Sequence, residues 1–127
     1  MEKPYLSGYI EVGSIHKLYY SCWGSKKGKT VLLIHGGPGY GSNPQMLEGF
    51  DLEKWNLIMY DQRGCGHSLP LGEITENNTE YLIEDIKEVL DFLGYSKVVI
   101  SGNSWGTTLA VAFAERYPHY VESMILS

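Results

Sequence analysis

The sequence predicts an α/β fold in which an antiparallel hairpin leads into a mostly parallel sheet flanked by helices. Short apolar runs alternate with longer amphipathic stretches along the 127-residue chain, which is the pattern that α/β units produce. Two of the runs are the continuous apolar kind that forms strands covered on both faces. Turns rich in glycine follow several of the runs and mark the ends of the strands. A chain of this length is expected to form one domain at most.

The first half of the chain is predicted to contain four strands and one short helix. The first two strands mix apolar and polar side chains, as strands wet on one face do, and Gly13 and Ser14 fit a hairpin turn between them. The third strand is continuously apolar, and the third and fourth strands both end at glycine-rich turns. The predicted strands cover residues 9–12, 17–23, 30–34 and 55–60, and the short helix covers residues 45–50.

The second half is predicted to contain two helices, each followed by a strand. Apolar side chains recur in the first helix at helical spacing and form one stripe. Asn77 or Asn78 can cap its start, and Gly94 can end it in the left-handed conformation. The second helix is expected to end before Pro118. The helices are predicted over residues 77–93 and 104–117, and the strands over residues 97–101 and 123–127.

Composition and charge limit the classes of function. Fifteen acidic against ten basic residues give a net charge of −5, whereas a protein that binds nucleic acid normally carries a basic face. Apolar runs fall short of the roughly 18 residues of a membrane helix, and the first residues lack the apolar core of a secretion signal. We therefore expect a cytoplasmic protein with no membrane partner, in which Cys22 and Cys65 are reduced thiols. The four histidines lack zinc-motif spacing, so neither a metal nor a cofactor is expected.

The strongest chemical signal is Gly102-Asn103-Ser104-Trp105-Gly106, a G-x-S-x-G pattern between a predicted strand and a predicted helix. A sharp turn there lifts the Ser104 hydroxyl above the sheet, and the two glycines let strand and helix approach closely. The N-terminus of the helix favours the negative charge that develops in acyl transfer. The pattern predicts Ser104 as a nucleophile. The alternative is that Ser104 only caps the helix.

A second glycine-rich loop follows the predicted strand at residues 30–34. It consists of His35, Gly36, Gly37, Pro38 and Gly39. Acyl transfer needs backbone N–H groups aimed at the forming oxyanion, and glycines supply them without side-chain obstruction. We expect the N–H groups of Gly37 and Trp105 to be the two donors, with the rest of the loop supporting them. The alternative is a tight turn that serves conformation only.

A third motif, at residues 61–68, follows the strand at residues 55–60. Asp61 and Arg63 are expected to hold this turn through hydrogen bonds and an ion pair, which is a structural role. A catalytic role for Asp61 or His67 is the alternative.

The three motifs together resemble the α/β-hydrolase superfamily and, more narrowly, the proline iminopeptidases, also called prolyl aminopeptidases. That family shows HGGPG, then DQRGCG-x-S, then an N-T-rich helix start, then GGSWG, and this chain has counterparts in the same order. The one clear departure is Asn103, where the family usually has glycine. The resemblance implies that Ser104 attacks the carbonyl of an N-terminal proline and that water then hydrolyses the acyl-enzyme.

The resemblance also implies that residues 1–127 are the N-terminal part of an α/β-hydrolase core domain, truncated before the cap domain and ending in the strand after the nucleophile helix. Members of the superfamily place the triad acid and histidine after the serine. Glu115 and His119 would lie about 15 Å or more from the Ser104 hydroxyl, at about 1.5 Å per helical residue. Glu122 follows at the same distal end. The triad acid and base are therefore expected to be absent from the chain, which would be inactive alone.

Two other functions stay open. The first is another α/β-hydrolase, such as an esterase, lactonase or amidase, acting on a small amide or ester rather than a peptide. The second is a non-catalytic remnant that oligomerises, because an open, apolar last strand invites pairing with another chain. A flavodoxin-like nucleotide binder is disfavoured, since the loop at residues 35–39 matches neither phosphate-binding glycine motif.

Overall fold

The computed structural model describes residues 3–36, 41–72 and 78–126, which form one six-stranded sheet. The strand order is β1-β2-β4-β3-β5-β6. Strand β2 is antiparallel to both of its neighbours, and β4, β3, β5 and β6 run parallel to one another. The predicted fold class is thereby confirmed. The strands are β1 (Leu6–Val12), β2 (His16–Gly24), β3 (Lys29–Ile34), β4 (Trp55–Tyr60), β5 (Val98–Gly102) and β6 (Val121–Leu126).

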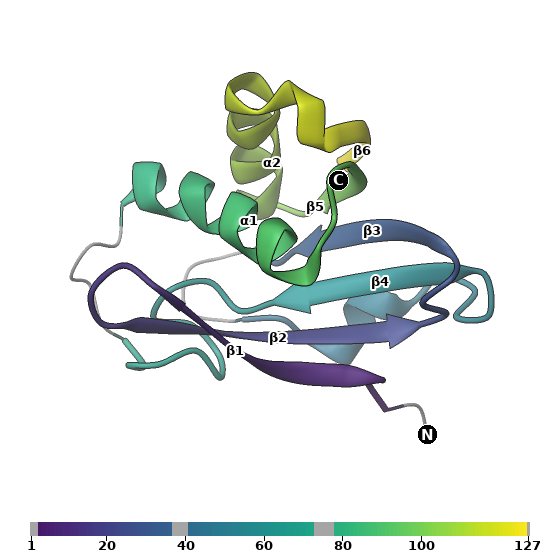
Figure 1. Cartoon of the computed structure of the whole chain (residues 1–127), viewed down its shortest axis with the longest axis horizontal. Helices are drawn as coiled ribbons and strands as arrows, with labels where there is room; N and C mark the ends of the chain where they lie inside the picture. The colour runs from purple at the N-terminus through teal and green to yellow at the C-terminus, as the bar shows by residue number, and fades with distance from the viewer. Residues whose placement is uncertain (1–2, 37–40, 73–77, 127) are drawn as a thin grey trace.

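Two helices cover one face of this sheet, α1 (Thr79–Leu93) and α2 (Trp105–Arg116) (Figure 1). Their apolar side chains form the larger core cluster with alternate residues of the strands, among them Leu32 and Ile34 of β3. Val31 and Leu33 point to the other face, where they pack with the short 3-10 helix η1 (Pro44–Leu47) and the segment after it. Strand β3 is therefore buried on both faces, as its continuous apolar run predicted.

The boundaries of several elements differ from the predicted ones. Helix α1 begins after Asn78, whose side chain accepts a hydrogen bond from the N–H of Tyr81, and it ends at Gly94 with φ 86°. Asn77 lies outside the described residues. The helix predicted near residue 45 is a single 3-10 segment. Strand β6 begins at Val121 rather than at residue 123, because the 3-10 turn η2 (Pro118–Tyr120) leads directly into it.

Strand β2 corrects one expectation. It was predicted to be wet on one face, yet the neighbouring residues Ser21 and Cys22, which point to opposite faces, are both buried. The reason is packing on both faces over the second half of the strand: Cys22 lies in the larger core cluster, and the indole of Trp23 donates a hydrogen bond to Oγ of Ser21 at 2.9 Å on the other face.

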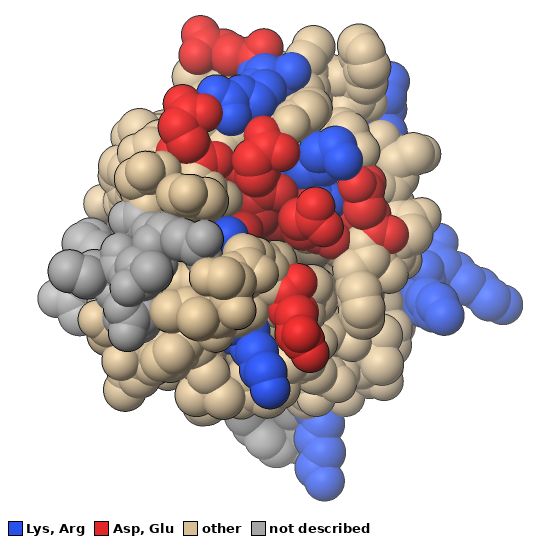
Figure 2. Space-filling model, turned by 60° about the vertical axis from the view of Figure 1, so that its left-hand side comes forward, with Lys and Arg blue, Asp and Glu red and all other residues tan. Residues whose placement is uncertain are grey.

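Oppositely charged side chains meet on the outer surfaces of the two helices. Figure 2 shows acidic groups gathered on one face, with basic groups among them. Arg116 of α2 pairs with Glu80 at 2.6 Å and with Glu84 at 3.2 Å, so exposed ion pairs join α2 to α1. Within the described parts of the chain, no helix has the length and apolar character needed to cross a membrane.

Strand β6 is one edge of the sheet and is more exposed than the strands inside it. It pairs with β5 on one side, and Met124, Ile125 and Leu126 are 40%, 45% and 43% exposed. The open apolar edge that the sequence predicted is therefore present at β6.

Candidate active site

The candidate site lies at the carboxyl ends of β3, β4 and β5, where the three predicted motifs begin. Because β3 lies between β4 and β5 and all three run parallel, their following loops meet at one edge of the sheet. A pocket of about 290 Å³ opens there. Its lining residues are His35, Gly36, Gly41, Asn43, Met46, Asn103 and Ser104.

Ser104 stands in the turn between β5 and α2 with a strained backbone. Its φ of 57° and ψ of −119° make it the one non-glycine residue with positive φ among residues that the structure describes. Such a conformation costs about 1–3 kcal/mol and is found where a site demands it. Ser104 occupies the N-cap position of α2, but its side chain makes no capping hydrogen bond. The exposed hydroxyl is therefore not used as a helix cap.

Three glycines allow the backbone to close around this turn. A Cβ on Gly102 would collide with the carbonyl oxygen of Gly106, and a Cβ on Gly106 would collide with that of Ile34. A Cβ on Gly36 would lie 2.7 Å from the carbonyl oxygen of Asn103. Strands β3 and β5 and helix α2 can therefore approach this closely only with glycine at these positions.

The backbone N–H of Trp105 is suited to receive an oxyanion. Trp105 is the first residue of α2, so its N–H belongs to the helix turn that has no acceptor within the helix. It follows Ser104 directly and lies at the positive end of the helix. The other predicted donor, Gly37, lies outside the described residues together with Pro38 and Gly39.

His35 is buried, and both of its ring nitrogens are engaged. Nε2 accepts a hydrogen bond from the N–H of Gln62 at 3.0 Å, so Nδ1 carries the proton and donates to the carbonyl oxygen of Gly36 at 3.0 Å. Burial lowers the pKa of His35 below its ordinary value, which favours this neutral form. His35 therefore supports the loop after β3, and neither nitrogen is available to Ser104.

The side chain of Gln62 was not predicted as part of the site. Its Nε2 donates to the carbonyl oxygen of His35 at 3.0 Å, and its Oε1 accepts from the indole Nε1 of Trp105 at 3.1 Å. Gln62, in the turn after β4, thus forms hydrogen bonds to the segments that follow β3 and β5. Its position in the third motif, two residues after the end of a strand next to β3, is the signal that could have identified it.

Asp61 stabilises the start of the turn after β4. Its buried carboxylate accepts hydrogen bonds from the N–H of Ser42 at 2.6 Å, from the Ser42 hydroxyl at 2.5 Å and from the N–H of His67 at 2.8 Å. These bonds join the segment before η1 to the turn after β4. Ser42 was not predicted either, because it lies outside the three motifs.

Arg63 makes its ion pair with a residue far away in the sequence. Its Nε lies 2.6 Å from Oδ2 of Asp85, and its Nη2 lies 2.8 Å from Oδ1, in a bidentate pair between side chains that are 3% and 2% exposed. The guanidinium also lies 4.9 Å from the ring centre of Tyr81. The pair therefore fastens the turn after β4 to helix α1.

His67 lies away from the pocket. Its ring is 75% exposed, packs against Tyr19 of β2 at 5.1 Å, and has Nδ1 at 3.4 Å from Oδ2 of Asp61. Tyr19 lies in β2, which β4 and β3 separate from β5 in the sheet, and His67 is not among the residues that line the pocket at Ser104. The alternative of a catalytic His67 gains no support from this position.

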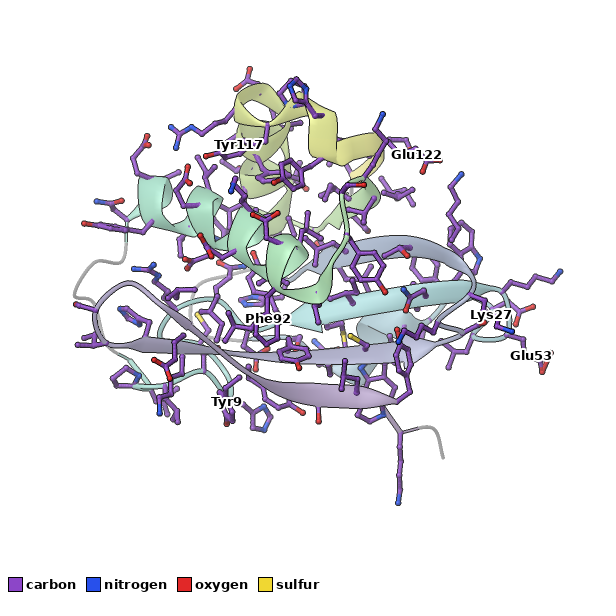
Figure 3. All side chains as sticks on the ribbon, in the orientation of Figure 1. Tyr9, Lys27, Glu53, Phe92, Tyr117 and Glu122 are labelled. Carbon is purple, nitrogen blue, oxygen red and sulfur yellow. The ribbon has the colours of Figure 1, made fainter. Side chains whose placement is uncertain are left out.

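The candidates that follow Ser104 in the chain are at the opposite end of the sheet. Glu115 is in the last turn of α2, and His119 is in η2. Glu122 of β6 pairs with Lys29 at the start of β3 and lies toward the same end of the molecule as Lys27 (Figure 3). No group of three or more metal-binding side chains occurs within the described ranges.

Comparison with known proteins identifies the family and several relatives of the chain. Residues 29–127 match the family model described as alpha/beta hydrolase fold. The chain is 37% identical over 126 residues to the proline iminopeptidase of Neisseria meningitidis serogroup A, covering 99% of this chain and 41% of that protein. It is 40% identical over 123 residues to the probable proline iminopeptidase of Leptolyngbya boryana, covering 97% of this chain and 38% of that protein. The chain thus spans about two fifths of the length of these relatives.

Solved structures resemble the chain over nearly its whole length. The proline iminopeptidase-related protein of Thermus thermophilus is 30% identical with a TM-score of 0.83, covering 95% of this chain and 43% of that one. The proline iminopeptidase of Mycobacterium smegmatis shares the fold, with a TM-score of 0.82 at 24% identity over 94% of this chain and 42% of that one.

Proposed function

The chain belongs to the α/β-hydrolase fold family, and from this premise we propose that it carries the nucleophile of a serine hydrolase of the proline iminopeptidase type. The observation that carries the proposal is the strained Ser104, whose hydroxyl faces a pocket and is not used to cap α2. The relatives named proline iminopeptidase, at 37% and 40% identity, support the substrate class.

In the proposed reaction, the Ser104 oxygen attacks the carbonyl carbon of the first residue of a peptide. The hydroxyl proton passes to a general base, and the carbonyl oxygen becomes an oxyanion held by the Trp105 N–H and, as predicted, by the N–H of Gly37. The C–N bond then breaks, and the leaving amine takes up a proton. Water hydrolyses the resulting ester and releases the N-terminal residue and the Ser104 hydroxyl.

The general base is the part of this reaction that the described residues do not supply. All four histidines lie in described segments: His35 is engaged at both nitrogens, and His67 faces β2. His119 follows α2 at the far end of the sheet, and His16 begins β2. We therefore propose that the 127-residue chain holds Ser104 in a reactive position but, by itself, hydrolyses substrate slowly or not at all.

Labelling with a fluorophosphonate, read by intact mass and peptide mapping, tests the nucleophile. Ser104 should react faster than Ser96, an exposed serine in an ordinary turn, and added imidazole should accelerate the reaction by serving as the base. The Ser104→Ala variant should lose the label, whereas Ser96→Ala should keep it. Labelling of folded protein at another residue, or equal rates at both serines, would contradict the proposal.

The substrate class needs a separate comparison. A protein that contains this chain and a working base should hydrolyse prolyl 4-nitroanilide in preference to alanyl 4-nitroanilide and 4-nitrophenyl acetate. Preference for the acetate ester would instead favour the esterase alternative while leaving the role of Ser104 intact.

A further inference from the structure

Gln62 is the side chain on which the three loops of the site converge. It is only 3% exposed, it makes three hydrogen bonds to the other two loops, and its Nε2 also lies 3.4 Å from Nδ1 of His35. Its backbone N–H donates to Nε2 of His35, its side-chain Nε2 donates to the carbonyl oxygen of His35, and its Oε1 accepts from the indole of Trp105. The reaction proposed above assigns no role to this residue.

The chemistry of its partners permits only one orientation of the Gln62 amide. An indole N–H can only donate, and a backbone carbonyl can only accept. If the amide were reversed, two donors would face each other at Trp105 and two acceptors would face each other at His35. The two bonds of the side chain therefore reinforce each other, and the amide acts as a rigid bridge between its partners.

Both ends of this bridge reach backbone that borders the pocket. At one end, the bonded carbonyl of His35 belongs to the peptide that leads into Gly36, which lies against Asn103 and Ser104. At the other end, the bonded indole belongs to the residue whose backbone N–H follows the nucleophile. One side chain thus links the two backbone segments, which also pack directly on each other at Gly36 and Gly106.

We propose that Gln62 is a positioning residue that holds the His35–Gly36 peptide and Trp105 at a fixed separation, so that the Trp105 N–H is preorganised as an oxyanion donor. The role in oxyanion binding rests on the proposed function, but the bridging geometry of Gln62 can be tested without an activity assay. Preorganised donors are what oxyanion stabilisation requires, because they need no rearrangement during the reaction.

The test is a set of ¹H–¹⁵N spectra of the 127-residue chain and its variants. In Gln62→Met, the indole N–H of Trp105 should exchange with solvent roughly tenfold faster, as expected for one lost buried hydrogen bond. The backbone amide signals of Gly36 and Trp105 should shift together. Gln45→Met is the matched control, because Gln45 is exposed and its substitution should leave these signals unchanged.

A second variant separates the two ends of the bridge. Gln62→Glu keeps an acceptor for the indole but replaces the donor toward His35, so the indole should stay protected while the Gly36 amide shifts. If Gln62→Met does not fold, Trp105→Phe removes the indole donor instead, and the Gly36 amide should still respond. Unchanged Gly36 and Trp105 amides in folded Gln62→Met, or an unchanged Gly36 amide in Trp105→Phe, would overturn the proposal.

These outcomes are distinct from those of the labelling experiment. If the amides respond as expected but Ser104 does not react with the fluorophosphonate, the proposed function fails and the positioning role of Gln62 stands. If Ser104 reacts and the amides do not respond, only the role of Gln62 fails.

Discussion

Replacing Ser104 with glycine should stabilise the protein while removing the nucleophile. At φ 57° and ψ −119°, a residue with a Cβ carries a strain of about 1–3 kcal/mol, and glycine adopts this backbone without it. Glycine also makes the unfolded chain more flexible, which costs about 0.4–1 kcal/mol of stability. The difference predicts that Ser104→Gly is more stable than Ser104→Ala by about 1 kcal/mol.

The comparison with alanine isolates the strain, because both variants lack the hydroxyl and only alanine keeps the Cβ. Urea denaturation followed by circular dichroism gives the free energies of unfolding, and a gain of about 1 kcal/mol corresponds to a rise of about 4 °C in Tm for a chain of this size.

The matched control is the same pair of substitutions at Ser96, where φ is not positive. Glycine should there be less stable than alanine by about 0.4–1 kcal/mol. If Ser104→Gly were no more stable than Ser104→Ala, the strain would not reside at this residue, and the argument for an elbow built around the nucleophile would fail.

Three further predictions concern the supports of the site and the edge of the sheet. Asp85→Leu should lower the free energy of unfolding, measured by urea denaturation, by about 3–5 kcal/mol because it leaves the buried Arg63 charge uncompensated. The double variant Asp85→Leu with Arg63→Met should recover most of this loss. An equal loss of stability in the single and the double variant would refute this account. Burial holds the folded pKa of His35 below 6.5, so the stability due to neutral His35 is complete above that pH and is lost as the pH falls below it, at up to about 1.4 kcal/mol per pH unit. Denaturation of wild type and His35→Asn at several pH values should show a flatter profile in the variant, and parallel profiles would contradict the assignment. The exposed β6 edge should make the chain self-associate in light scattering, and Ile125→Lys should weaken the association roughly tenfold; a monomer at high concentration would count against it.

The sequence predicts those helices and strands whose spacing of apolar residues is distinctive. The continuous apolar run of β3 and the stripe of α1 both correspond to observed elements, because burial on two faces and on one face leaves different periodicities. The start of β6 was misplaced by two residues, since a 3-10 turn after Pro118 leaves no periodic signal. The burial of Ser21 was missed because it depends on what packs over that face of β2, where the indole of Trp23 bonds to its hydroxyl.

The site was predictable in its turns but not in its long-range partners. The G-x-S-x-G context predicted a sharp turn at Ser104, and a strained turn is found there. The bond between Gln62 and Trp105 spans 43 positions, and the pair of Arg63 with Asp85 spans 22. A local motif can indicate that a polar residue needs a partner, but it carries no information about which distant side chain the fold brings to it.

The strands of the sheet differ in how many neighbours they pair with, and this implies an order in which they separate during local unfolding. Strand β6 has a single neighbour and exposed side chains, whereas β5 pairs on both sides, so β6 should separate before β5. When it does, β5 becomes the edge strand but keeps its full pairing with β3. The turn at Ser104 depends on β5, α2 and β3, and it should therefore outlast the detachment of β6 as part of one cooperative unit.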